Sequence, residues 1–447
     1  MNRRQRFLFI GTAPLAAAVA LFACSDDDPR QRFEEKPDAV ASLPEAAAPL
    51  EDEDGGVVDA RTPEDAADQP LICTAKPCVT QIVGGRNHFC ALLDDKTVRC
   101  WGSGYRALGI YDGGNESASY QPRPTSMGLS GVEQISAANL TTCARLTNGT
   151  VTCWGASQAN ELGLDPPRED FNPHGPTPIA VDGGVVDGFT RVDVGASGVV
   201  FATKTSGELW SWGDNADYVL GRVNEGTKYL GPGPATDLAG VKVSRAGGAT
   251  FRSYGGIGLA ITDEGQLITW GSSRQMVAYP GPVPVPVADF ENVTSVAATT
   301  GHVCAVADGR LYCWGRDGAL ACTGSTHAAV TPVAIETRGR ARVQQVSLYI
   351  RNTCVRLIDG TIECCGSDDQ GQLGTGEMDA GALTARLLTE AKAFTGHALQ
   401  IAVGISTVCA LVQGGTVQCW GGNERGELGQ GTADGERHPT PVTVTFD

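Results

Sequence analysis

The sequence predicts an all-β protein whose repeats stack into one body, and two observations support that prediction. A stretch of 14 or 15 residues returns seven times, each copy reading as an apolar strand, a short turn and a second strand that closes on Trp-Gly or a variant of it. The copies occupy residues 88–102, 141–155, 199–213, 257–271, 302–315, 352–366 and 407–421. Five of them also carry one cysteine on each strand. The Trp-Gly positions of successive copies lie 44 to 58 residues apart, and a repeat with a period of this length indicates a solenoid or a propeller. We therefore expect one body of repeats instead of the two or three ordinary domains that 447 residues could form.

The N-terminal residues read as an export signal. Three arginines among the first six residues precede an apolar run over residues 7–21, which is too short and too closely followed by acidic residues to favour a permanent membrane span. The run ends in Leu-Phe-Ala-Cys, which resembles the lipobox of bacterial lipoproteins, where the cysteine is acylated and becomes the new N-terminus. We expect residues 1–23 to be a lipoprotein signal peptide and Cys24 to be lipidated. An uncleaved anchor and plain secretion are the alternatives.

Residues 24–70 are expected to form an acidic, disordered tether. Between residues 25 and 70, 15 Asp or Glu stand against four Lys or Arg, among many Ala and Pro and almost no aromatic side chain. Such a segment cannot bury enough apolar surface to offset the entropy of ordering. As a flexible chain it would reach roughly 40 Å, enough to lift a folded body clear of lipid headgroups. A leader without a spacing role is the alternative.

The charge of the chain argues against nucleic-acid partners. The formal charge of −17 becomes −20 once the three arginines of the signal are removed, and the tether carries −11 of this, which leaves −9 on residues 71–447. Binding to a phosphate backbone needs a basic surface, and no run of Lys or Arg supplies one. We therefore expect neither DNA nor RNA as a partner.

Fifteen cysteines in an exported chain predict disulfides. With Cys24 lipidated, 14 remain, and the repeat itself predicts five pairs: Cys90 with Cys100, Cys143 with Cys153, Cys304 with Cys313, Cys354 with Cys364, and Cys409 with Cys419. The two copies that lack the first cysteine also lack the second, as a covalent partnership predicts. Parity alone suggests two further pairs, Cys73 with Cys78 and Cys322 with Cys365, the second of which would bridge neighbouring repeats.

The cysteine spacing fits a clamped β-hairpin. With Cys143 opposite Cys153, residues 147–149 form a three-residue loop whose Gly supplies the left-handed conformation of a bulged turn. The fifth copy is one residue shorter, and there Asp308 and Gly309 form a two-residue type I′ turn that keeps its cysteines opposed. A zinc site is the alternative, but zinc ligands come roughly two to four residues apart within a knuckle. We expect no metal site.

A second element follows most Trp-Gly anchors. It reads ALG, ELG, VLG, QLG and ELG at residues 107–109, 161–163, 219–221, 372–374 and 427–429. The fifth repeat has a weaker ALA, the fourth has no clear copy, and Cys365 replaces the Trp of the sixth. Together with the Gly-x-x-His approach at residues 85–88, the Ala-bearing strand and the turn, these motifs resemble the regulator of chromosome condensation repeat over about residues 79–447. The resemblance implies a seven-bladed β-propeller of four-stranded blades.

The two ends of the repeat region suggest how such a ring would close. After a short Cys-containing lead-in over residues 71–78, the chain enters inside a unit at residues 79–85. It ends on residues 440–446, which look like the strand missing from the first blade. We predict that the N- and C-terminal strands pair within one blade, which would close the ring and remove free edges.

The sequence offers few groups for catalysis. His88 and His302 lie at equivalent repeat positions, which favours a structural hydrogen bond over a catalytic role. The sequence contains no nucleophile elbow, zinc-protease motif or phosphate-binding loop, and the four acids within residues 368–379 lack the spacing of a known calcium loop. We predict a protein without catalytic residues and without a bound cofactor.

Function is expected in the segments that vary between repeats, since loops on a rigid scaffold commonly carry it. Three of these segments, residues 104–124, 215–234 and 272–286, hold Tyr, Arg and Met, which are enriched where proteins bind proteins. The candidate partner-binding residues are Tyr105, Arg106, Tyr111, Tyr120, Tyr218, Tyr229, Arg274, Met276 and Tyr279.

Three functions fit these expectations. We favour a monomeric, lipid-anchored module of the bacterial cell envelope, at the outer membrane or cell surface, that holds a protein or glycan on one propeller face. The second is a secreted binder of a hydrolase, because the β-lactamase inhibitory propeller shares this repeat class. The third is nucleotide exchange on a small GTPase, the founding family's activity, against which export and disulfides argue. Fold alone does not decide among them.

Overall fold

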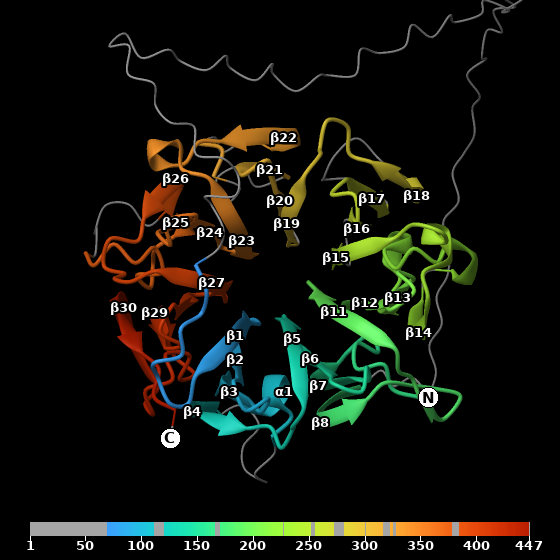
Figure 1. Ribbon diagram of the computed structural model, residues 1–447, viewed down its shortest axis with the longest axis horizontal. Helices are drawn as coiled ribbons and strands as arrows, with labels where there is room; N and C mark the ends of the chain where they lie inside the picture. Colours follow the sequence, from blue (N-terminus) through green and yellow to red (C-terminus); the bar gives the residue numbers. More distant parts are fainter. Residues whose placement is uncertain are drawn as a thin grey trace, which may run out of the picture. The chain divides into compact units, whose positions relative to one another are not determined.

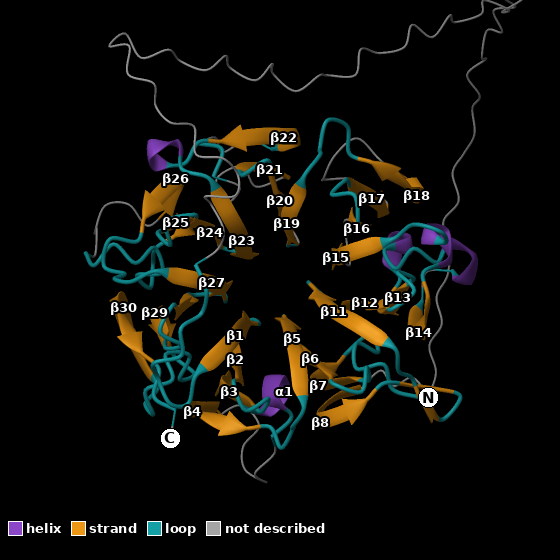
Figure 2. Ribbon diagram, viewed as in Figure 1, coloured by secondary structure: helices purple, strands orange, loops and turns teal. Residues whose placement is uncertain are grey.

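The computed structural model describes residues 69–446, except 111–119, 166–169, 227, 252–254, 272–280, 300, 316–321, 325–327 and 378–383. Within this part of the chain, seven four-stranded antiparallel sheets stand around a common axis as the blades of a ring (Figure 1), and the ring is almost entirely strand and loop (Figure 2). The predicted seven-bladed propeller is confirmed. The signal peptide and Cys24 lie outside the described residues, as does the tether up to residue 68.

Each blade uses four consecutive strands, ordered from the axis outward. Blade 1 holds β1 (Val79–Gly84), β2 (His88–Leu93), β3 (Val98–Ser103) and β4 (Tyr120–Ser126); blade 2 holds β5 (Val132–Ala138), β6 (Thr141–Leu146), β7 (Val151–Ser157) and β8 (Asp170–Pro178). Blade 3 holds β11 (Phe189–Gly195), β12 (Val199–Lys204), β13 (Leu209–Asp214) and β14 (Tyr229–Pro234); blade 4 holds β15 (Val243–Phe251), β16 (Gly255–Thr262), β17 (Leu267–Gly271) and β18 (Gly281–Pro286). Blade 5 holds β19 (Val293–Ala298), β20 (His302–Ala307), β21 (Arg310–Gly315) and β22 (Ala329–Ile335); blade 6 holds β23 (Val343–Tyr349), β24 (Asn352–Leu357), β25 (Ile362–Ser367) and β26 (Thr384–Glu390). Blade 7 holds β27 (Ala398–Val403), β28 (Thr407–Val412), β29 (Val417–Asn423) and β30 (Asp434–Thr443), and a small ribbon of β9 (Ala180–Val181) and β10 (Gly184–Val185) lies between blades 2 and 3 along the chain.

The recurring hairpin forms the two middle strands of each blade. Cys143 and Cys153 are directly opposed, as are the cysteines of the other four copies, and their Cα atoms lie 4.0 to 4.1 Å apart. The turns follow the predicted chemistry: Gly149 has a φ of 77°, and Asp308 and Gly309 have φ values of 51° and 72°. A type I′ turn needs positive φ at both central residues, which Asp and Gly tolerate. Local turn chemistry therefore sets the register that brings each cysteine pair together.

The outermost strands lack the sequence motif that the middle hairpins share, and most of them contain proline. Six of the seven outer strands contain at least one, as in Tyr-Leu-Gly-Pro-Gly-Pro of β14, and β26 is the exception. Proline cannot donate to a ladder, so within a sheet it is confined to edges where the missing N–H would face solvent. The prolines therefore also oppose edge-to-edge pairing with another chain.

The predicted closure by terminal strands is wrong. The first blade already has four strands of its own, with β1 paired to β2, and the C-terminal strand β30 pairs with β29 in blade 7. The sequence-based assignment failed because the fourth strand of blade 1 follows a long connection and holds two prolines, so that residues 440–446 seemed to supply it. The ring closes instead by packing between two complete blades.

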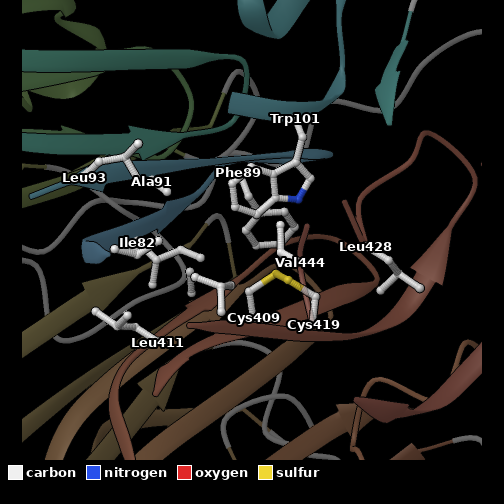
Figure 3. Packing of buried hydrophobic residues seen from close by; sticks show 13 residues of the cluster. Ile82, Phe89, Ala91, Leu93, Trp101, Cys409, Leu411, Cys419, Leu428 and Val444 are labelled. Carbon is white, nitrogen blue, oxygen red and sulfur yellow. A yellow bond between two sulfur atoms is a disulfide. The ribbon is translucent and has the colours of Figure 1, made fainter. Parts of the chain in front are cut away.

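The interface between blades 7 and 1 shows what closes the ring. Phe89 and Trp101 of blade 1 share a buried cluster with the Cys409–Cys419 disulfide of blade 7 (Figure 3), and Val444 joins them from beyond β30. Comparable buried clusters of described residues lie between blades 1 and 2, 2 and 3, 3 and 4, 5 and 6, and 6 and 7. Burial of apolar area, at about 25 cal/mol per Å², is the principal stabilising term at each interface.

A buried tryptophan also joins each of several blades to the one before it. The indole Nε1 of Trp101 donates to the carbonyl of Glu427 at 2.8 Å, across the closing interface. The equivalent bonds run from Trp212 to Glu161, Trp270 to Val219 and Trp420 to Gln372, at 2.8 to 3.0 Å. All four acceptors belong to the L-G element of the preceding blade. We call this contact the Trp latch, and it explains why the two motifs recur together.

Blade 6 replaces the Trp latch with a covalent bond. Cys365 occupies the Trp position and forms a disulfide with Cys322, which follows the weak L-G element of blade 5. Both cysteines are buried in the apolar cluster between these blades. Cys73 and Cys78 are also joined, in the lead-in. The structure thus pairs all 14 cysteines of residues 69–446 as the sequence suggested.

Among the described residues, none of the helices has both the length and the apolar character needed to cross a membrane.

Candidate functional site

Strand alternation gives the propeller two different faces. The connections between the first and second strands, such as 85–87 and 404–406, leave on the same side as those between the third and fourth strands, such as 104–119 and 215–228; we call this side the loop face. The opposite side, the turn face, holds the hairpin turns at residues 94–97, 147–150, 205–208, 263–266, 308–309, 358–361 and 413–416. The loop face carries the longer and more variable segments.

The candidate partner-binding residues that are described all lie in connections of the loop face. Tyr105 and Arg106 belong to the short helix α1 (Tyr105–Leu108), and Tyr120 begins β4, all in blade 1. Tyr218 ends the 3-10 helix η2 (Ala216–Tyr218), and Tyr229 begins β14, both in blade 3. Tyr111, Arg274, Met276 and Tyr279 lie outside the described residues. The structure thus places the described candidates on one face but on two blades, with blade 2 between them.

Exposure separates the binding candidates from the residues that hold the blades together. Arg106 is exposed, Tyr120 is 42% exposed, and Tyr218 and Tyr229 are half-buried. Their neighbours Ala107 and Leu108 are fully buried, because α1 packs against β7 and β8 of the next blade. Each of these segments therefore anchors two blades with its apolar side, which fixes its polar and aromatic side chains on a rigid base.

A central channel connects the two faces, lined by the innermost strands that surround the axis in Figure 1. On the turn-face side it widens into a cavity of about 800 Å³ with mostly polar walls. Toward the loop face it narrows to about 220 Å³ between Ala, Gly and Ser residues. There the hydroxyl of Tyr349 in blade 6 lies 3.5 Å from Oδ1 of Asn139 in blade 2, and burial raises the pKa of Tyr349 to about 12. The phenol is protonated at neutral pH, and it lines the narrow end of the channel.

The wide cavity is bordered by one equivalent residue from each innermost strand, which we call the channel position. Its occupants are Gln81, Gln134, Arg191, Arg245, Ser295, Gln345 and Gln400. The amide of Gln81 both accepts from the N–H of Ile135 and donates to its carbonyl, at 2.9 Å each. Gln134 and Gln345 bond the next blade in the same two-way manner, and Gln400 accepts from the N–H of Ile82. Glutamine at this position thus ties adjacent inner strands that share no ladder.

The two repeated histidines have a structural role, as the sequence favoured. Nε2 of His88 lies 2.8 Å from Oγ1 of Thr142 in the next blade, and Nε2 of His302 lies 2.8 Å from Oγ1 of Thr353. Both rings are fully buried, and burial lowers the pKa of each to about 4, so both are neutral at pH 7. The sequence held a signal that we missed: threonine occupies its position only in the two blades that follow a histidine-bearing blade.

The buried histidines predict a loss of stability in mild acid. Each histidine has a pKa of about 4 in the folded protein and 6.5 in the unfolded chain. Between these two pH values the unfolded chain binds the proton and the folded protein does not, so stability falls as the pH drops from 6.5 to 4. We expect the two histidines together to cost roughly 4 kcal/mol between pH 7 and pH 5. Urea unfolding of the wild type and of H88N/H302N at both pH values measures this difference, and Asn352 shows that Asn fits the position.

The pH dependence of the wild type must be compared with that of H88N/H302N, because Glu161 changes stability with pH in the direction opposite to the histidines. Burial raises the pKa of Glu161 to about 7, so its proton is bound more tightly in the folded state and its contribution to stability grows as pH falls. Glu161 is present in both proteins and cancels from the difference. An equal pH dependence in the wild type and the double variant would contradict the assigned role of the histidines.

No group of three or more His, Cys, Asp or Glu side chains within the described residues is arranged to hold a metal ion. Two of the acids within residues 368–379 form hydrogen bonds inside their own loop. Asp369 accepts from Arg351, Ser367 and Gln372 at 2.8 to 2.9 Å. Asp368 accepts from the N–H of Leu373. These bonds shape the L-G element of blade 6, whose Gln372 carbonyl accepts the Trp latch from Trp420 of blade 7.

Comparison with known proteins returns the same repeat. A sequence model of the regulator of chromosome condensation (RCC1) repeat matches residues 79–106 and 399–427. The ultraviolet-B receptor UVR8 of Arabidopsis thaliana is 27% identical to this chain over 325 residues, which are 70% of either chain. The mitochondrial RCC1 domain-containing protein RUG3 of the same plant is 26% identical over 215 residues, 46% of this chain and about half (47%) of RUG3.

Solved structures agree on the fold. Prp20p from Saccharomyces cerevisiae, a structure described together with its binding to Gsp1p and histones, is 17% identical with a TM-score of 0.63, over 83% of this chain and 88% of that chain. Human WBSCR16 is 20% identical with the same TM-score, over 78% of this chain and 95% of that chain. At this identity the likeness supports the propeller architecture alone.

Proposed function

The chain belongs to the regulator of chromosome condensation repeat family, and on that premise we propose that it is a lipid-anchored binding module of the bacterial cell envelope. The propeller holds a protein partner on its loop face and carries out no catalysis. A glycan is the second class of ligand that the same face could take. The observation that carries the proposal is the combination of a lipobox-like Cys24 with a propeller whose connections between the third and fourth strands open on one side.

The chain enters the propeller on the face opposite the candidate binding residues. The lead-in bonds to the blade 7 turn on the turn face: the N–H of Ile72 donates to Gln413, that of Thr74 to Gly414 and that of Val79 to Gly415, at 2.9 to 3.1 Å. The Cys73–Cys78 disulfide stiffens this segment. The described chain therefore enters the propeller on the turn face, opposite the loop face.

The remaining features support binding rather than turnover. The buried histidines are neutral and bonded to threonine, and no metal-binding cluster lies among the residues that the structure describes. The charge of −9 on residues 71–447 favours a partner that is not itself acidic. The Tyr and Arg side chains of the loop face make a protein the preferred class of partner, because these residue types are enriched in protein interfaces. A hydrolase partner would instead indicate the inhibitor function, and a small GTPase would indicate nucleotide exchange.

Proximity labelling from the full-length protein in its native cell tests the proposal. We expect wild-type protein in the membrane fraction and C24A in the soluble exported fraction. The loop-face variant R106A/Y120A/Y218A is expected to label its main partner at least tenfold less, because exposed Tyr and Arg side chains dominate such interfaces.

The matched control for that experiment is K242A/E264A, which alters exposed residues of the turn face. We expect its labelling pattern to equal that of the wild type. Membrane retention of C24A would contradict lipid anchoring, and undiminished labelling by the loop-face variant would contradict the assigned face. The two parts of the proposal can therefore fail separately.

A further inference from the structure

The channel position departs from its own pattern in blades 3 and 4. Five of the seven occupants accept a hydrogen bond from a backbone N–H of the next blade, including Ser295, whose Oγ lies 3.3 Å from the N–H of Val346. Arg191 and Arg245 hold this position in the other two blades, and a guanidinium cannot accept. The side chain at the channel position of these two blades therefore does not accept a hydrogen bond from the next blade.

Arg191 is fully engaged by a neighbouring carboxylate. Its Nε and Nη2 donate to both oxygens of Asp193 on the same strand, at 2.7 to 3.0 Å. The same carboxylate receives the backbone N–H of Ala246 in blade 4, at 3.3 Å, which restores the link between blades 3 and 4. Asp193 thus neutralises Arg191 and takes over the function that glutamine has elsewhere.

Arg245 has no such compensation. Its side chain is accessible to water, lines the wide cavity, and makes no hydrogen bond or ion pair with the residues that the structure describes. Protein atoms surrounding the guanidinium and the like charge of Arg191 lower the pKa of Arg245, and Asp193 offsets this only in part. An arginine remains charged under these conditions, so one uncompensated positive charge stands on the channel wall.

The cavity suits a small ligand better than a macromolecule. Its volume of about 800 Å³ lies in the range of small-molecule sites, and the channel narrows at Tyr349 beyond it. Four cationic side chains and three acidic ones line it. At the rim, Lys96 and Glu133 neutralise each other at 3.3 Å. Arg191 is paired with Asp193, and Arg356 is buried. Arg245 is therefore the exposed cation that remains for a ligand, and Asp94 is the remaining acid of the lining.

We propose that the turn-face end of the channel is a binding site for a small oxyanion, a carboxylate or a phosphate, in which the guanidinium of Arg245 donates two parallel hydrogen bonds. Planar bidentate recognition of carboxylate or phosphate is the geometry that arginine provides best. The site lies on the face opposite the partner-binding loops, so it adds a ligand to the function proposed above. Arg245 replaces a side chain that would bond the next blade, and such a loss of a structural contact is expected at a functional site.

Isothermal titration of the folded wild-type protein with sodium phosphate and with sodium succinate, at constant ionic strength, tests the site. We expect saturable binding of one equivalent of at least one of them. R245Q is expected to bind at least tenfold more weakly, and R338Q, which removes the same charge from the outer surface, is expected to bind as the wild type does. Saturation by only one of the two anions assigns the class of ligand.

The substitution itself is chosen to preserve the fold, because four other blades carry glutamine at the channel position. We expect R245Q without anion to melt about 1 to 2 °C higher than the wild type, since its amide can bond the next blade. R245K keeps the charge but loses the paired donors, and is expected to bind at least threefold more weakly. Absence of saturable binding by the wild type, or unchanged affinity in R245Q or R245K, would overturn the proposal.

Discussion

The C322S/C365S variant is expected to lose about 4 kcal/mol of unfolding free energy, as the chain-entropy relation gives for a disulfide that closes a 43-residue separation. The bridge joins blades 5 and 6, because blade 6 has a cysteine in place of the tryptophan that would form a Trp latch. Its removal weakens this interface and leaves two serine hydroxyls in an apolar cluster. Urea unfolding under non-reducing conditions measures the change.

The matched control for the bridge is C143S/C153S, which removes a disulfide of separation 10 within a single hairpin. The same relation gives about 3 kcal/mol for this shorter loop. Amide hydrogen exchange separates the two variants further: we expect C322S/C365S to lose protection on both sides of the blade 5–6 interface, in β21 and β25, and the control to lose it within β6 and β7. Loss of protection confined to one blade in C322S/C365S would show that the bridge does not act as a latch.

Replacing Trp101 by alanine is expected to lower the unfolding free energy by about 3 to 5 kcal/mol, the range for a large aromatic side chain removed from a core. Trp101 is fully buried, stacks near Phe89 at 6.0 Å between ring centroids, and closes the ring through its bond to Glu427. Its loss should therefore separate blade 7 from blade 1. Thermal and urea unfolding of W101A measure the effect.

Phenylalanine at the same position isolates the hydrogen bond from the packing. W101F keeps an aromatic ring but leaves the Glu427 carbonyl without its buried donor, which should cost about 1 to 2 kcal/mol. W154F is the control, because Trp154 is equally buried in blade 2 and loses the same packing, but its Nε1 finds no acceptor among the described residues. W101F should therefore destabilise the protein by about 1 to 2 kcal/mol more than W154F does. If W101F and W154F change stability equally, the Trp latch contributes packing alone.

The middle hairpin of each blade was fully predictable. The spacing of Cys143 and Cys153, with Asn148 and Gly149 between them, determines the turn, and the turn determines which residues face each other. These interactions span about ten residues, so the sequence itself contains both partners. The same locality explains why the short fifth copy could be aligned correctly through Asp308 and Gly309.

The outer strands and the closure of the ring were not predictable in the same way. The residues of β4 resemble a loop in sequence, because they include two prolines and do not alternate between apolar and polar residues. Missing that strand made the C-terminal residues look like its substitute, and the closure prediction failed with it. For the candidate site, the sequence identified the variable segments and the repeats to which they belong, but not which face of the propeller they share.

The amino-acid sequence by itself determined the repeat, the hairpin register and the cysteine pairs, because turn chemistry and covalent spacing act between residues close along the chain. Only the tertiary structure decided which blades meet, that Cys365 substitutes for a tryptophan by bonding Cys322, and that Arg245 faces the channel without a partner. Those features depend on residues from different repeats whose proximity exists only after seven blades have closed into a ring.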